Sequence, residues 1–177
     1  EHPDWVKDIH RSYVEAGADI IYANTFGANR EKLTRTGHTT GEVVAAGISL
    51  ARRAAGDRAL VALDVGPLGQ LLEPTGTLRF EDAVDRFAEV MEAGVAAGAD
   101  LVVIETMSDL YEAKAALLAA KEHTPLPVLA TMSFEASRRT FLGCDIPSMA
   151  LTLTALGADA IGINCSLGPL QMAPLVE

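Results

Sequence analysis

The chain has 177 residues, of which 49% are hydrophobic, and it carries a formal net charge of −10. This composition is typical of one globular domain with a sizeable core, and it excludes a disordered chain. The acidic excess, with no Lys- or Arg-rich run to offset it, would repel a phosphate backbone and so argues against a nucleic-acid partner.

Neither end of the sequence suggests a membrane or export signal. No apolar run approaches the about 18 residues that a membrane span needs, and the first ten residues, EHPDWVKDIH, lack the basic start and apolar run of a signal peptide. We therefore expect a soluble, cytoplasmic protein. Two cysteines, Cys144 and Cys165, do not suggest a disulfide scaffold in such a chain, so at least one thiol is expected to be free for chemistry.

The first half of the chain alternates predicted helices and strands. WVKDIHRSYVEAG is predicted to be a helix, and EAGADIIYANTFG, which starts at Glu15, contains a helix-ending glycine followed by a strand. Val44, Ile48 and Ala51 recur at helical spacing and predict the next helix. A second strand is predicted in AAGDRALVALDVGP, which starts at Ala54.

The longest predicted helix follows this strand and carries an apolar stripe that we expect to lie in the core. The stripe consists of Phe80, Val84, Phe87, Met91 and Val95. The remaining elements, in chain order, are a strand in AAGADLVVIETMS, a helix from Leu110 to Leu117, a strand in LPVLATMSF, a helix from Met149 to Leu156, a strand in ALGADAIGINCSLG and a helix begun in GPLQMAPLVE.

Strict alternation of buried strands and helices predicts an α/β fold with a parallel sheet, either doubly wound or part of a (β/α)8 TIM barrel. Polar residues follow every predicted strand, namely Asn24, Thr25, Asp64, Glu105, Thr106, Ser133, Asn164 and Cys165. In a barrel these strand ends converge on one mouth, whereas an open sheet would spread them along an edge. We therefore favour a partial barrel containing strands 2 to 6 with their helices.

The predicted barrel is incomplete. A whole barrel usually needs about 250 residues, and only five strands are predicted in residues 1–177, which we take as a single incomplete domain. Two parallel sheet edges would be left without partners. We expect these edges either to mediate self-association or to pair with further polypeptide.

Four stretches resemble the homocysteine S-methyltransferase family: HRSYVEAGADIIYANTFGANREKL, LDVGPLG, VIETMSDLYEAKAAL and GADAIGINCSLGP. They occur in the family's order over nearly the whole chain. The likeness is greatest to the homocysteine-binding N-terminal domain of cobalamin-dependent methionine synthases, with the family's first strand and its last part missing at the two ends.

The resemblance implies methyl transfer to a zinc-activated homocysteine thiolate, giving methionine. The methyl donor is methylcobalamin in the nearest branch of the family, and S-methylmethionine or betaine, the donors of more distant relatives, are the alternatives. It also implies that Zn²⁺ is held by three cysteines, one of which matches Cys165. The other two, a Cys-Cys pair after a Gly pair, are absent from this sequence. The alternative is a catalytically incompetent chain, or a subunit that needs a second chain, with at most weak amino-acid binding.

Cys165 is the candidate metal ligand, since a thiolate at a strand end is a suitable soft ligand for zinc. A lone cysteine is otherwise most often a small buried hydrophobe. Cys144, in the loop after the fourth predicted strand, is a weaker candidate. No catalytic residue is assigned, because zinc would ionise the substrate thiol without a general base.

The candidate substrate-binding residues are Asn24, Thr25, Asp64 and Glu105. Glu105 ends a run of buried apolar residues, where a carboxylate is costly unless it meets a cation, and the resemblance supplies the ammonium group of homocysteine. Asp64 is a candidate for the same contact with the ammonium group, and formation of a turn is an equal alternative for this residue. Asn24 and Thr25 are expected either to bind the substrate carboxylate or to build a turn.

Overall fold

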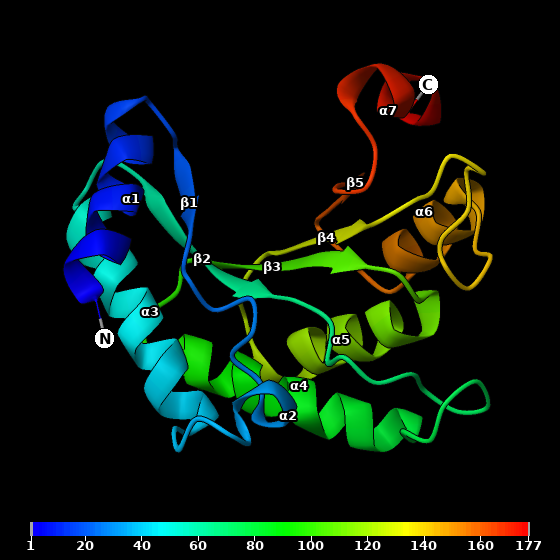
Figure 1. Ribbon diagram of the computed structural model, residues 1–177, viewed down its shortest axis with the longest axis horizontal. Coiled ribbons are helices and arrows are strands. Elements are labelled where there is room, and N and C mark those ends of the chain that lie inside the picture. Colours follow the sequence, from blue (N-terminus) through cyan, green and yellow to red (C-terminus); the bar gives the residue numbers. More distant parts are fainter. Residues whose placement is uncertain (1, 177) are drawn as a thin grey trace.

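The computed structural model describes residues 2–176 and contains one five-stranded parallel sheet (Figure 1). The strands lie in the sheet in the order in which they occur in the chain. They are β1 (Ile20–Tyr22), β2 (Leu60–Val65), β3 (Leu101–Met107), β4 (Val128–Met132) and β5 (Ala160–Ile163). Every predicted strand is therefore present, and neighbouring strands are joined by helical crossovers.

Seven helices accompany the sheet in the part of the chain described. They are α1 (Pro3–Glu15), α2 (Arg30–Leu33), α3 (Thr40–Ala55), α4 (Phe80–Ala96), α5 (Leu110–His123), α6 (Ile146–Ala155) and α7 (Pro169–Val176). In Figure 1, α3, α4 and α5 lie together on one face of the sheet. The short helix α2 was not predicted.

The repeated Gly-Ala-Asp step is a structural device at the amino ends of the strands. Gly17, Gly98 and Gly157 have φ values of 95°, 84° and 87°, the left-handed conformation in which a glycine ends a helix. Asp100 and Asp159 then accept hydrogen bonds from backbone N–H groups near the start of adjacent strands, those of Val61 in β2 and Val128 in β4, at 2.7 and 2.8 Å. The repeat thus ends a helix and aligns two strands.

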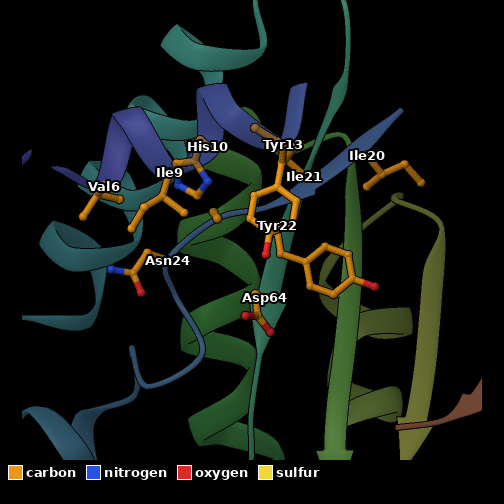
Figure 2. A pocket seen from close by; sticks show the side chains of 10 residues that line it. Val6, Ile9, His10, Tyr13, Ile20, Ile21, Tyr22, Asn24 and Asp64 are labelled. Atoms are coloured by element: carbon orange, nitrogen blue, oxygen red, sulfur yellow. The ribbon is translucent and has the colours of Figure 1, made fainter. Parts of the chain in front are cut away.

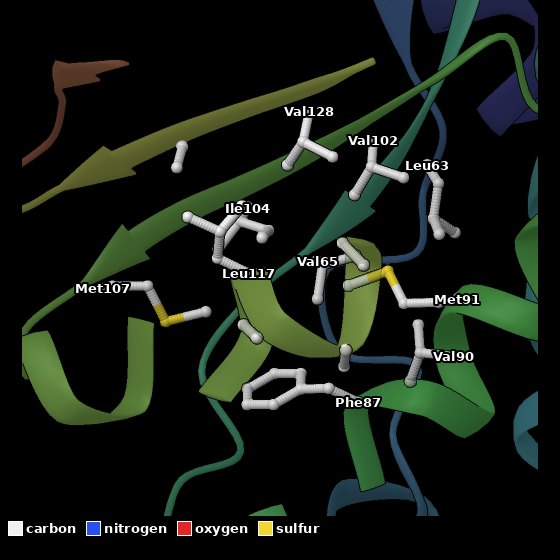
Figure 3. Close-up of a cluster of buried hydrophobic side chains, with 14 of the residues drawn as sticks. Leu63, Val65, Phe87, Val90, Met91, Val102, Ile104, Met107, Leu117 and Val128 are labelled. Carbon is white, nitrogen blue, oxygen red and sulfur yellow. The ribbon is translucent and has the colours of Figure 1, made fainter. Parts of the chain in front are cut away.

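The main core lies between the sheet and its helices (Figure 3). Phe87 and Met91 of α4 and Leu117 of α5 have no exposed surface and pack toward the apolar face of β2 and β3. The predicted stripe is thus confirmed at its centre. Val95, at the end of the stripe, lies in the last turn of α4 and is 37% exposed.

The third strand extends past Glu105 and Thr106, the polar residues expected at its end. Strand β3 continues to Met107 through an irregularity between Ile104 and Met107 in its pairing with β4. Thr106, within this irregularity, has φ 59°, which is an outlier for a β-branched residue. The sheet therefore bends at the position where its polar residues begin.

The outer strands β1 and β5 each pair with one neighbour among residues 2–176. Ile20 and Tyr22 on β1 are each 40% exposed, and Leu60 on β2 is 50% exposed. These side chains belong to the sheet face opposite the main core, where only a small apolar cluster around Val103 is buried.

No helix within residues 2–176 combines the length and apolar character that a membrane crossing requires.

Candidate active site at the carboxyl ends of the strands

Asp64 is a buried carboxylate near the end of β2. Its side chain lies on the face opposite the main core, and Oδ1 has no hydrogen-bond partner among the described residues. Burial, followed by the negative charge of Glu105, raises the pKa of Asp64 to about 7. A buried oxygen with no donor is costly, so this position is suited to a cation or to another donor.

Glu105 on β3 faces the same region. Burial raises the pKa of Glu105, and burial, Glu105 and Asp64 together raise the pKa of Tyr22. Three acidic groups from β1, β2 and β3 therefore share one electrostatic environment. A bound ammonium group would lower the pKa of both carboxylic acids by favouring their charged forms.

Thr25 joins the end of β1 to β2. Its hydroxyl donates to the Asp64 carbonyl oxygen at 2.8 Å and accepts from the Asp64 backbone N–H at 3.0 Å. Thr25 is buried, whereas Asn24 is exposed beside it. The hydroxyl of Thr25 is thus engaged in holding Asp64, and the amide of Asn24 is accessible to solvent.

A cavity of about 550 Å³ opens between α1 and β1 (Figure 2). Val6, Ile9, His10 and Tyr13 of α1 line one side, and Tyr22 and Asp64 are among the residues that line the other. His10 is buried, its Nε2 has no hydrogen-bond partner among residues 2–176, and burial lowers its pKa. Asp64 and the His10 imidazole therefore line the same cavity, whose other α1 residues are largely apolar.

Cys165 is exposed at the carboxyl end of β5 and is connected to β3. The Thr106 hydroxyl donates to Cys165 Sγ at 3.7 Å. The Asn164 side chain, which precedes Cys165, contacts Thr106 and Glu105. The structure thus brings the Cys165 thiol close to the end of β3, the strand that carries Glu105, as expected if the strand ends share one site. At the same end of the sheet, the Ser133 hydroxyl donates to the Ser166 hydroxyl at 3.2 Å.

The described residues do not supply a complete zinc site. Among residues 2–176, no group of three or more His, Cys, Asp or Glu side chains is placed to hold a metal ion, whereas zinc takes about four ligands, of which at least three come from the protein. Cys144 is half-buried, its Sγ donates to the Asp145 carbonyl oxygen at 3.2 Å, and burial raises its pKa. Cys165 fits one zinc ligand position, but residues 2–176 offer no set of further ligands around it.

The raised pKa of Asp64 predicts a pH-dependent stability. The pKa of Asp64 in the folded chain, about 7, lies above the ordinary value of 3.8. The contribution of Asp64 to the free energy of unfolding is therefore full below about pH 4 and is lost as the pH rises through 7. We expect Asp64→Asn to reduce the fall in unfolding free energy between pH 5 and pH 8, measured by urea denaturation. Some of the fall will persist, since burial also raises the pKa of Glu112 to about 7. The exposed control Asp57→Asn should retain the wild-type slope, and an unchanged slope in Asp64→Asn would contradict the assignment.

Sequence reasoning missed three contributors to this region: His10, Tyr22 and Thr106. His10 and Tyr22 have the spacing of helix and strand residues, and their convergence on Asp64 arises from the packing of α1 on β1. Thr106 was noted only as part of a strand end, and its positive φ has no signal in the sequence. Asn164 was expected only as one of the polar residues at the strand ends, whereas its hydrogen bonds link the end of β5 to β3 and β4.

Comparison with known proteins identifies the family of this chain. The profile of the homocysteine S-methyltransferase family matches residues 1–177. Methionine synthase from Mycobacterium tuberculosis (strain ATCC 25618 / H37Rv) is 32% identical over 184 residues, which cover 97% of this chain and 15% of that protein. Methionine synthase from Mycobacterium leprae (strain TN) has the same identity and coverage. The chain therefore spans about a sixth of the length of these relatives.

The fold also matches a solved structure. The metallated form of the homocysteine methyltransferase MmuM from Escherichia coli superposes with a TM-score of 0.83 at 22% identity, covering 93% of this chain and 64% of that one. This likeness bears on the fold and confirms the predicted α/β partial barrel. The whole-length match to the family profile, together with the relatives that share about a third of its residues, shows that the chain belongs to the homocysteine S-methyltransferase family.

Proposed function

We propose that this chain forms the homocysteine-binding part of a methyltransferase domain, in which a methyl group is transferred to the homocysteine sulfur to give methionine. One observation carries the proposal: two carboxylic acids with raised pKa, Asp64 and Glu105, lie at the same end of the sheet as the exposed thiol of Cys165. The membership of the family and the methionine synthase relatives support this choice of substrate.

Each site residue has a role in binding the amino acid. Glu105 and the unpartnered Oδ1 of Asp64 would accept hydrogen bonds from the substrate ammonium group. The exposed Asn24 amide would donate to the substrate carboxylate, and Thr25 would hold Asp64 in place through its backbone. Binding of the cation would offset the cost of placing a half-buried acid, Glu105, near a buried acid, Asp64.

We retain Zn²⁺ as the metal and Cys165 as one of its ligands in the complete domain. Bound zinc would supply ionisation of the substrate thiol. Residues 2–176 offer one thiol at this position, which is fewer than the three protein ligands that a zinc site needs. Methylcobalamin is likewise proposed as the methyl donor of the longer enzyme, by similarity to the cobalamin-dependent branch of the family.

A second candidate function is that the chain is catalytically incompetent on its own, or is a subunit that needs a second chain, with at most weak amino-acid binding. The observation that favours it is the single exposed thiol. Calorimetric titration of the purified chain with L-homocysteine, zinc analysis and a methyl-transfer assay distinguish the two. Turnover with 1:1 zinc contradicts the second candidate, weak homocysteine binding without zinc or turnover supports it, and an absence of homocysteine binding contradicts the first.

We also propose that the exposed edges of the sheet mediate self-association. The Ala23 N–H and the Asp19 carbonyl oxygen form hydrogen bonds with β2. Because the backbone groups of successive strand residues point to opposite sides, the N–H of Ile20 points to the free edge of β1. We expect sedimentation velocity to show oligomers of the wild-type chain and fewer in Ile20→Pro, which removes that donor. The control Ile20→Thr keeps the donor and should resemble the wild type, and a monomeric wild type would contradict the proposal.

A further inference from the structure

The side-chain amide of Asn164 is fully used by neighbouring strands. Its Oδ1 accepts from the Thr106 backbone N–H at 3.1 Å and from the Thr131 hydroxyl at 2.9 Å. Its Nδ2 donates to the Thr106 hydroxyl at 2.7 Å and contacts Glu105 Oε2 at 3.4 Å. Two acceptor positions and two donors exhaust the capacity of an Asn amide, so this orientation alone satisfies all four partners.

The hydrogen bonds of Asn164 hold Thr106 in a backbone conformation that β-branched residues disfavour. Thr106 has φ 59°, and Cys165 and Ser166 on the facing segment have φ 59° and 55°. Such conformations persist only when the surroundings determine them, and they concentrate at functional sites. The short bonds from Asn164 to both the N–H and the hydroxyl of Thr106 are the contacts that stabilise this conformation of Thr106.

Holding Thr106 also orients Glu105. The Thr106 N–H that bonds to Asn164 belongs to the peptide unit whose carbonyl comes from Glu105, so this bond fixes the backbone next to the carboxylate. The longer contact from Asn164 Nδ2 to Glu105 Oε2 then restricts the side chain. Through its hydroxyl, Thr106 also reaches Cys165 Sγ on the opposite side.

We propose that Asn164 is a positioning residue that acts through Thr106 to orient the Glu105 carboxylate toward the ammonium group of the bound amino acid. This inference rests on the proposed function, because it takes the ammonium group as the partner of Glu105. It adds that ammonium recognition depends on two residues that do not touch the substrate. Removing the supporting side chain is expected to lower homocysteine affinity about tenfold, as for other residues that orient a direct ligand.

The test uses two ligands and matched variants of the full chain. L-Homocysteine and 4-mercaptobutanoate share a thiol and a carboxylate, and only the first has an ammonium group. Calorimetry should show that Asn164→Ala and Thr106→Val lower affinity for homocysteine about tenfold and leave affinity for 4-mercaptobutanoate unchanged. Thr106→Ser, which keeps the hydroxyl that the isosteric Val lacks, should restore the wild-type value. An equal loss for both ligands, or no loss, would overturn the proposal.

A second measurement separates this proposal from the proposed function. If the wild type does not prefer homocysteine over 4-mercaptobutanoate, the assignment of Glu105 to the ammonium group is wrong. Amide hydrogen exchange then tests the network directly, with the Val103 amide of the same strand as the reference. Exchange of the Thr106 amide about tenfold or more faster in Asn164→Ala supports the positioning role, since it reports the loss of one bond. Unchanged exchange of that amide overturns it.

Discussion

Glu105→Gln is expected to weaken L-homocysteine binding by about 10- to 100-fold. Hydrogen bonds that involve a charged group contribute about 1.5–3 kcal/mol, and about 1.4 kcal/mol corresponds to a factor of ten in affinity. Glutamine preserves the size of the side chain and one acceptor oxygen, so the loss isolates the negative charge. Isothermal titration calorimetry at neutral pH measures the change.

The control for this prediction is Glu122→Gln. Glu122 is exposed on α5, away from the carboxyl ends of the strands, and its substitution by Gln removes the same charge as Glu105→Gln does. The control should bind homocysteine as the wild type does. Equal affinity in Glu105→Gln and the wild type would show that the Glu105 carboxylate does not bind the ammonium group.

Phe87→Ala is expected to lower the free energy of unfolding by about 3–5 kcal/mol, the range measured for truncation of buried aromatic residues. Phe87 has no exposed surface and packs in the core between α4, α5 and the sheet (Figure 3). A domain of this size has about 5–15 kcal/mol in total, so the variant loses a large part of its stability. Urea denaturation followed by circular dichroism measures the difference.

Leu151→Ala serves as the control for Phe87→Ala. Leu151 is 76% exposed on α6, so its truncation should change the unfolding free energy by about 0.5 kcal/mol or less. If Phe87→Ala has an effect as small as this, the placement of the main core between α4 and the sheet is wrong.

The strand and helix order could be predicted because local signals agree along this chain. Gly17, Gly98 and Gly157 end helices in the left-handed conformation, and apolar runs with β-branched residues follow them. The boundary of β3 could not be predicted in this way. The bulge that carries Thr106 depends on pairing with β4 and on the side chain of Asn164, which is 58 residues away.

The candidate site, too, could be predicted from the sequence only in part. The sequence places Asp64, Glu105 and Cys165 after apolar runs, and parallel strands bring their carboxyl ends to one edge, so a common site could be predicted. The sequence could not indicate that the Thr25 hydroxyl bonds to the backbone of Asp64, because that bond requires the register of β1 against β2.

The sequence by itself thus determined the family, the alternation of helices and strands, and the set of polar residues at the strand ends, since each depends on short-range pattern. Only the tertiary structure decided which of these side chains meet: Tyr22 and Asp64 beside Glu105, His10 across the cavity, and Asn164 bonded to Thr106. The physical reason is that hydrogen bonding and the electrostatic coupling of buried acids depend on distances of a few ångströms between segments far apart in the chain.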